Sequence, residues 1–286
     1  MTNSIWLDRQ YTFKRNKLET LAEKYYTSSF TRDLKSQTDC DEISEWIYQN
    51  TSGKFKPLIM ADPDTDHILK IVNTVTFKEK WTSSFGDPKE GTFKTADGEV
   101  QCPFMFDEEM GGSIIEDEDF VEYTKSFEDG YCMHFVLPAE EKTVDDVLSD
   151  ADVMKRVFSD ENTEYYRVLA NIPKFSSESK FDLIQSFKDA GVKEIFESAD
   201  LSPLMDFDEN DIPGAYVDEI THEAVIDVNE KGCEAAAYTL IDIAPNCPIT
   251  DNMTYYFDAD RPFIYYISNN DGVPVFVGVV NDPTQK

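Results

Sequence analysis

The sequence predicts an α+β fold in which large mixed β-sheets are covered by packed helices. Strand-like segments outnumber helical ones, and the helices interrupt them irregularly instead of alternating with them as in a βαβ winding. Hydrophobic residues make up 41% and aromatic residues 13% of the 286 residues, which is ample material for a core. No internal repeat, low-complexity tract or Gly/Ser-rich linker divides the chain. We therefore expect a single domain over residues 1–286.

The helices are predicted from apolar residues that recur three and four positions apart. Asp39, just before the second helix, and Glu42, three residues later, have the spacing of a capping box. Gly53 and Gly191 follow the second and third helices, and glycine is a common helix stop. The predicted helices occupy residues 14–27, 40–51 and about 180–190.

The strands are predicted from segments rich in β-branched and aromatic residues. The Ala96-Asp97-Gly98 sequence between two of these segments is a hairpin signature. The predicted strands occupy residues 68–77, 92–94, 100–104, 131–137, 165–172, 216–229, 262–267 and 273–280.

The chain is strongly acidic, with 26 Lys and Arg against 57 Asp and Glu and a formal net charge of −31. Nucleic acids and anionic membranes bind clustered cations, so neither is expected as a partner. A well-solvated acidic surface, or a basic partner, fits this charge better. The sequence has no apolar run of membrane-spanning length, and residues 1–30 have no signal-peptide core.

The sequence motifs of common enzymes are absent from the chain. It has no G-x-S-x-G elbow, Walker loop, GxGxxG or HExxH motif. The three histidines, His67, His134 and His222, are isolated in the sequence. A catalytic triad would therefore require contacts between distant residues, and we interpret each histidine as structural. We expect the protein not to be an enzyme.

A metal or cofactor is not expected either. Asp62, Asp64 and Asp66 alternate like the start of a calcium loop, but His67 and Asn73 stand where that loop requires Gly and Glu. The five cysteines are scattered and match neither a disulfide framework nor a zinc site.

The segment after residue 229 carries the candidate functional residues. With strand periodicity, one face carries small and apolar side chains, and the other carries Glu234, Ala236, Tyr238, Leu240 and Asp242. Small side chains allow a strand to enter an existing sheet without overpacking the layer beneath it. Residues 244–251 are polar and interrupted by prolines, as in an exposed loop that proteases cut. The small and apolar face consists of Cys233, Ala235, Ala237, Thr239, Ile241 and Ile243.

Several longer motifs follow one another along nearly the whole chain. They are HILKIVNTVTFKEKW (67–81), EGTFKTADGEVQCPFM (90–105), NIPKF (171–175), FDLIQSFKDAGVKEIFESADLS (181–202), AYVDEITHEAVIDVNEKGCEAAA (215–237), DADRPFIYYI (258–267) and VFVGVVNDP (275–283). In this order they resemble the motifs of the serpin family. The resemblance implies the serpin fold, with an exposed reactive-centre loop over about residues 230–256. It also implies truncation at the N-terminus, because residues 1–7 already resemble a sheet strand and the family's first helices have no counterpart. Apolar surface would then be exposed.

The resemblance also assigns roles to individual positions. Trp81 corresponds to the breach tryptophan, and Asn73 and His222 correspond to the shutter below the sheet. Family spacing counted from the hinge places the scissile bond at Asn246-Cys247, whereas counting back from residues 261–263 places it at Asp251-Asn252. The hinge positions are Glu230, Gly232, Cys233, Glu234, Ala235, Ala236 and Ala237.

The activity implied by the resemblance is inhibition of a serine or cysteine endopeptidase as a suicide substrate. The peptidase attacks the loop and forms a covalent acyl complex, and the cut loop inserts as a new strand in the main sheet. A monomer, secreted by family tendency, is expected. Two alternatives remain open: a non-inhibitory serpin-like carrier, chaperone or storage protein, and an inactive truncated protein.

Overall fold

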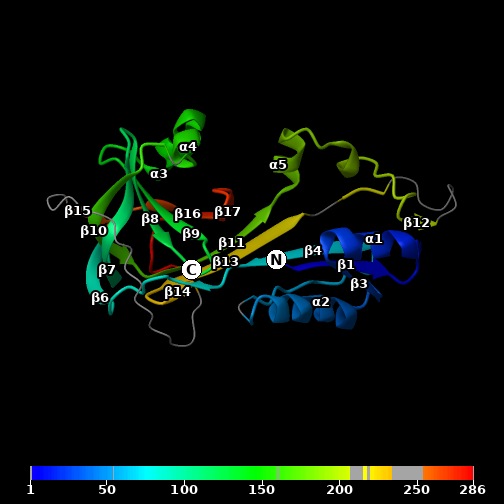
Figure 1. Ribbon diagram of the computed structural model, residues 1–286. Helices are drawn as coiled ribbons and strands as arrows, with labels where there is room; N and C mark the ends of the chain where they lie inside the picture. Colours follow the sequence, from blue (N-terminus) through cyan, green and yellow to red (C-terminus); the bar gives the residue numbers. More distant parts are fainter. Residues whose placement is uncertain are drawn as a thin grey trace. The chain divides into compact units, whose positions relative to one another are not determined.

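The computed structural model describes residues 2–53, 55–159, 161–206, 215–217, 220–233 and 254–285. The chain divides into two compact units (Figure 1). The first unit comprises Met1–Thr76 and Glu178–Val225, and the second comprises Phe77–Ser177 and Ile226–Lys286.

The first unit is built on strands that pair in the order β3-β1-β4-β13, with β11 also paired to β13. Strand β1 pairs in parallel with β3 and antiparallel with β4. The strands are β1 (Thr2–Asp8), β3 (Thr27–Arg32), β4 (Leu69–Thr76), β11 (Phe175–Asp182), β13 (Thr221–Asn229) and a separate pair of β2 (Thr12–Phe13) with β12 (Met205–Asp206). The helices are α1 (Arg15–Tyr25), α2 (Gln37–Asn50), α5 (Ile184–Asp189) and the 3₁₀ turn η1 (Glu194–Phe196).

The core of the first unit forms where α2 packs against the sheet. Ile43 and Ile47 of α2 are buried in one cluster with Trp6 of β1 and Leu34. The Trp6 ring stacks on Phe30, with 4.4 Å between the ring centroids. Because each buried aliphatic side chain contributes about 1.5–3 kcal/mol, this contact fixes α2 against β1.

The second unit contains an eight-stranded sheet in the order β15-β10-β7-β8-β9-β16-β17, with β6 paired to β7. Helices α3 (Val144–Ser149) and α4 (Ala151–Val157) pack on one face of this sheet (Figure 1), where their valines contact Ile264 and Tyr266. The strands are β6 (Lys89–Thr95), β7 (Gly98–Glu116), β8 (Phe120–Ser126), β9 (Cys132–Pro138), β10 (Glu164–Pro173), β15 (Thr254–Asp258), β16 (Phe263–Ser268) and β17 (Pro274–Val280). Two short strands, β5 (Glu79–Lys80) and β14 (Gly232–Cys233), pair with each other.

Most predicted elements are confirmed, but several details are wrong. The first helix ends at Tyr25, and Thr27 already belongs to β3. The strand predicted from residue 216 begins at Thr221. The third helix is shorter than predicted, because residues 180–182 extend strand β11 and α5 begins at Ile184. The predicted capping box is also wrong, because α2 begins at Gln37 and includes Asp39. The Asp39 carboxylate instead accepts a hydrogen bond from the Asp33 backbone N–H at 2.7 Å.

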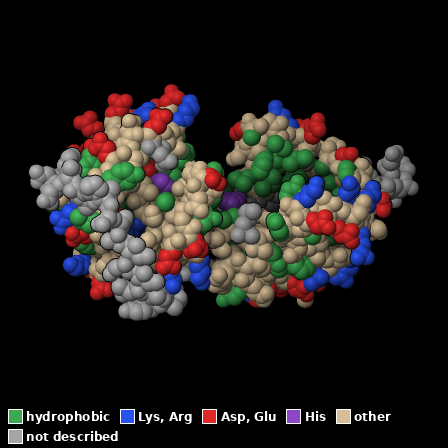
Figure 2. All heavy atoms as spheres, in the orientation of Figure 1, with side chains coloured by type: hydrophobic (Ala, Val, Ile, Leu, Met, Phe, Trp, Pro, Cys, Tyr) green, Lys and Arg blue, Asp and Glu red, His purple; other side chains and the backbone are tan. Residues whose placement is uncertain are grey.

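Hydrophobic side chains gather on the face of the first unit that carries α5 (Figure 2). Ile71 of β4 is 72% exposed, which is unusual for a large aliphatic side chain in a sheet. Among the other exposed large hydrophobic residues of the first unit are Phe181, Phe187, Val192 and Ile195.

Within the part of the chain that the structure describes, no helix is long and apolar enough to cross a membrane. The same residues include no group of three or more His, Cys, Asp or Glu side chains arranged to hold a metal ion. Cys40, Cys102 and Cys132 are thiols, and burial raises the pKa of the Cys102 thiol to about 11.

Candidate functional site

The start of the hinge is a tight turn that joins β13 to β14. The last residues of β13 pair antiparallel with β14, and β14 pairs on its other side with β5. Gly232 of β14 has a φ of +144°, and a Cβ at this position would lie 2.2 Å from the Glu79 carbonyl oxygen. It would also lie 2.7 Å from the Lys80 Cα. Only glycine combines this conformation with so close an approach of two backbones.

Trp81, the predicted breach residue, holds the backbone of this turn from one side. Its indole is 2% exposed, and its Nε1–H donates a hydrogen bond to the Asn229 carbonyl at 2.8 Å. Its backbone N–H donates to the Lys231 carbonyl at 3.2 Å. The indole stacks on Phe127 with 4.2 Å between ring centroids and 12° between ring planes. The structure thus brings Trp81 and the first hinge residues together.

Glu230 is fixed at both its backbone and its side chain. Its carbonyl accepts a hydrogen bond from the Phe85 N–H at 2.9 Å, and its carboxylate pairs with the Lys174 ammonium at 3.0 Å. Burial alone would raise the pKa of Glu230, but a hydrogen bond from its own backbone and the Lys174 charge outweigh burial and lower it. Sequence reasoning missed Lys174, and the available signal was a cation two residues after the predicted strand 165–172 of an acidic chain.

Glu230→Gln is expected to lose about 0.5–1 kcal/mol of unfolding free energy near neutral pH, the size of a partly exposed ion pair. Folding lowers the pKa of Glu230. The pair therefore stabilises the protein above the ordinary glutamate pKa, and this contribution disappears as the pH falls through the lowered value. Urea denaturation of both proteins at neutral and acid pH measures this difference, which should vanish in acid.

The matched control for this prediction is Glu108→Gln. Glu108 pairs with Arg167 at 2.6 Å, but both side chains are about half exposed, at 47% and 46%. The Glu108→Gln protein should lose less unfolding free energy than the Glu230→Gln protein, about 0–0.5 kcal/mol. A Glu230→Gln deficit that persists unchanged in acid would contradict the role given to the ion pair.

A buried cluster of charged and polar side chains lies next to Phe85, whose N–H binds the Glu230 carbonyl. Its opposite charges pair with each other. Lys125, whose side chain is 2% exposed, pairs with the Asp107 carboxylate at 2.5 Å and lies 4.8 Å from the centre of the Phe85 ring. The Tyr123 hydroxyl donates hydrogen bonds to Asp107 at 2.9 Å and Glu109 at 2.6 Å. Burial, together with these two acids, raises the pKa of Tyr123 well above its usual value. Because the buried Lys125 charge is paired with a carboxylate, it does not destabilise the packing around Phe85.

The predicted shutter residues lie in neighbouring strands of the first unit. β4 and β13 pair in parallel through Val75 with Ala224 and through the next residue of each strand. Among the described residues the ladder is limited to these two pairs, and Asn73 and His222 lie two positions before it on their strands. The Asn73 side-chain amide donates a hydrogen bond to the Asn3 side-chain carbonyl at 2.5 Å.

The remaining predicted site residues fall outside the described part of the chain. They are the hinge residues Glu234, Ala235, Ala236 and Ala237, and the two candidate scissile pairs Asn246-Cys247 and Asp251-Asn252.

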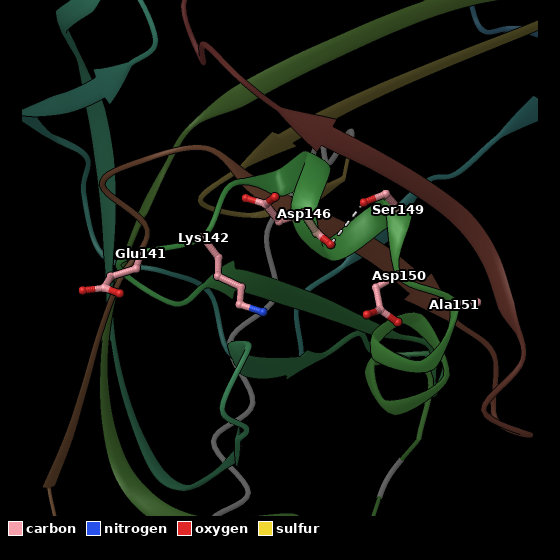
Figure 3. A pocket seen from close by; sticks show the side chains of 6 residues that line it. All are labelled: Glu141, Lys142, Asp146, Ser149, Asp150 and Ala151. Carbon is pink, nitrogen blue, oxygen red and sulfur yellow. Dashed lines mark hydrogen bonds between the residues drawn. The ribbon is translucent and has the colours of Figure 1, made fainter.

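An open hollow in the second unit lies beside α3 and α4 (Figure 3). Its polar groups are engaged in local structure. Thr143 and Asp146 form a capping box at the start of α3, and Asp150 caps α4. Lys142 pairs with Asp119. Because these groups cap helices or form an ion pair, the hollow is not a candidate site. Its lining residues are Glu141, Lys142, Asp146, Ser149, Asp150 and Ala151.

Comparison with curated proteins finds relatives that are longer than this chain. The chain is 28% identical to an uncharacterized serpin-like protein of Thermococcus kodakarensis, over 98% of this chain and 66% of that protein. It is 29% identical to antithrombin-III of Ovis aries, over 98% of this chain and 62% of that protein. For alpha-1-antiproteinase 2 of Equus caballus the identity is 26%, over 99% of this chain and 66% of that protein. The chain thus spans 62–66% of the length of these relatives.

Solved structures and a family model agree with these relatives. The structure resembles Serpin48 of the insect Tenebrio molitor with a TM-score of 0.81 and 26% identity, covering 98% of this chain and 75% of that one. It resembles the thermophilic serpin tengpin in its native state with a TM-score of 0.80 and 26% identity, covering 98% of this chain and 72% of that one. The family model described as serpin (serine protease inhibitor) matches residues 1–283. The chain therefore belongs to the serpin family and has the α+β fold of that family.

Proposed function

We propose that this protein inhibits a serine or cysteine endopeptidase as a suicide substrate. The peptidase cuts the loop after the hinge and forms an acyl-enzyme. The freed segment that begins at Glu234 then inserts between β4 and β13 before the acyl-enzyme is hydrolysed. This proposal combines the protease-inhibitor family with the geometry of the hinge and of the main sheet.

The observation that carries the proposal is the short pairing between β4 and β13. β4 has eight residues and β13 has nine. Among the described residues, their pairing is limited to Val75 with Ala224 and Thr76 with Val225. Strand edges with free backbone N–H and C=O groups are templates for an added strand. We propose that the cut loop inserts between the parts of β4 and β13 that lie N-terminal to these two pairs.

The segment after the hinge has the length and pattern of such a strand. The ten residues 234–243 would span about 33 Å when extended, at about 3.3 Å per residue. The eight residues of β4 would span about 26 Å on the same basis, so the segment can cover the whole strand. Its inward face is small and apolar, with Ala235 and Ala237 near the hinge. Such small side chains can enter the sheet without overpacking the layer beneath it.

The charge of the chain favours a basic peptidase. A net charge of −31 produces a negative potential that speeds encounter with a cationic partner and weakens as salt is added. Among loop residues, Asn246 suits an asparagine-cleaving cysteine peptidase, whereas Ala244 suits an elastase-like or subtilisin-like one.

Incubation with a panel of these peptidases tests the proposal. We expect an adduct with one of them that survives SDS, and mass spectrometry should place the cut within residues 244–252. The salt dependence of the association rate checks the charge argument in the same experiment. Degradation of the loop by every peptidase, with no adduct, would contradict the inhibitory function.

Ala237→Pro and Ala237→Ser form a matched pair for this experiment. Proline cannot donate a hydrogen bond to a sheet, so the Ala237→Pro protein should be cut at the same bond but should release active peptidase. Serine is small and keeps its backbone N–H, so Ala237→Ser should still form the adduct. Equal adduct yields from both variants would show that trapping does not require strand insertion.

A further inference from the structure

Three polar side chains from neighbouring strands form a hydrogen-bonded chain in the second unit. Glu122 lies on β8, His134 on β9 and Ser268 at the end of β16. The His134 Nδ1 lies 2.7 Å from the Glu122 Oε1, and the His134 Nε2 lies 2.8 Å from the Ser268 Oγ. The three residues are distant in sequence, so they are brought together by the order β8-β9-β16 of the sheet.

This order of atoms is the one that activates a serine in acyl-transfer enzymes. One imidazole nitrogen faces the hydroxyl and takes its proton, and the other is held by a carboxylate that stabilises the imidazolium. Both distances lie within the hydrogen-bonding range that proton transfer requires. Glu122 is 1% exposed, and His134 and Ser268 are each 5% exposed, so water competes little with these contacts.

The His134 ring is held in place by Tyr266 of β16. The two rings are stacked, with 4.0 Å between centroids and 3° between planes. The Tyr266 hydroxyl donates hydrogen bonds to Glu122 Oε1 at 3.2 Å and to the Val157 carbonyl at 2.9 Å. Among the described residues, the other carboxylate oxygen of Glu122 has no hydrogen-bond partner. The carboxylate is thus oriented by its neighbours and directed at the imidazole.

Ser268 lies at the margin of the buried sheet face. In the strand register it stands beside Cys132, which in turn stands beside Ser126. Cys132 is half-buried and Ser126 is exposed, so exposure increases along this row away from Ser268. On the other side, Val277 pairs with Tyr266 and is 48% exposed. Phe158 packs edge-on against Tyr266 and is 39% exposed. Ser268 is therefore itself buried, one strand away from half-buried Cys132, and has apolar neighbours.

We propose that Ser268 is a nucleophile, activated by His134 and Glu122, that accepts an acyl or phosphonyl group from a small apolar electrophile. With an ester, the Ser268 Oγ forms a bond to the carbonyl carbon as its proton passes to the His134 Nε2. The bond from that carbon to the leaving oxygen breaks, and His134 returns the proton to the leaving alkoxide. With a fluorophosphonate, the new bond is to phosphorus and fluoride leaves. This acylation site is separate from the bait loop and does not depend on it.

Labelling with a short-chain alkyl fluorophosphonate tests the proposal. The intact chain should be modified once, and peptide mass spectrometry should place the label on Ser268. Ser268→Ala should abolish this label. Ser126→Ala removes the exposed serine of the same row and should leave the labelling rate unchanged. His134→Gln should slow labelling by about 100-fold, which is the low end of a general base contribution.

Three results would overturn the assignment of Ser268. They are a label on another residue, equal labelling of the Ser268→Ala protein, and full-rate labelling of His134→Gln. If the thermal melt shows that His134→Gln does not fold, the pH dependence of the labelling rate of the unmodified chain tests the role of His134 instead. Glu122 and Tyr266 face His134, and labelling must slow in acid because a protonated imidazole cannot accept the serine proton. A flat pH profile would reject the mechanism.

Discussion

Gly232→Ala is expected to lower the free energy of unfolding by about 2–5 kcal/mol. Two costs combine in this figure. A residue with a side chain in a glycine-type backbone conformation is strained by about 1–2 kcal/mol, and overpacking adds about 1–3 kcal/mol. The second cost arises because the new methyl group would lie 2.2 Å from the Glu79 carbonyl oxygen and 2.7 Å from the Lys80 Cα. These are backbone atoms and cannot rotate away, so β14 must separate from β5.

Gly98→Ala is the matched control, because Gly98 has a similar φ of +137° but no atom within 4 Å of a built Cβ. This variant should show only the conformational cost of about 1–2 kcal/mol. Guanidinium denaturation of the two variants and the parent chain measures the difference. Equal losses at both positions would mean that contact between β14 and β5 does not constrain the hinge.

Much of the fold could be predicted because its strands carry strong local signals. The segment 68–77 is long and β-branched, and it becomes β4. The Ala96-Asp97-Gly98 turn joins β6 to β7, with Gly98 at a positive φ that glycine adopts freely. By contrast, α3 and α4 have six and seven residues. They are too short to show a clear helical periodicity.

The contacts that define the candidate site could not be predicted in the same way. Lys174 and Glu230 are separated by 56 positions, and Ser268 and His134 by 134. No local pattern encodes such pairs, since they depend on which strands become neighbours. The isolation of His134 in the sequence favours a structural role, and its contacts with Glu122 and Ser268 depend on that same strand order.

Cleavage of the loop within residues 244–252 is expected to raise the stability of the protein by about 5 kcal/mol or more. The gain comes mainly from Ile241 and Ile243, whose inward side chains would each contribute about 1.5–3 kcal/mol on burial. New backbone hydrogen bonds offset the cost of ordering the inserted strand. At about 2–4 °C per kcal/mol, the melting temperature should rise by about 10 °C or more.

Two aspartate variants separate the faces of the inserted strand. Ile241→Asp would place a carboxylate on the face that enters the sheet, where an unpaired charge is costly, so cleavage should no longer stabilise the protein. Leu240→Asp places the same group on the opposite face and should keep most of the gain. Equal behaviour of the two variants would contradict the predicted alternation of residues 233–243.

The most direct test of strand insertion is a thermal melt of the same preparation before and after the loop is cut. A peptidase that cuts within residues 244–252 without being trapped is suitable, and mass spectrometry confirms the position of the cut. Insertion between β4 and β13 predicts that the cut chain melts about 10 °C or more above the intact chain. A cut chain that melts at the same temperature, or lower, would contradict it.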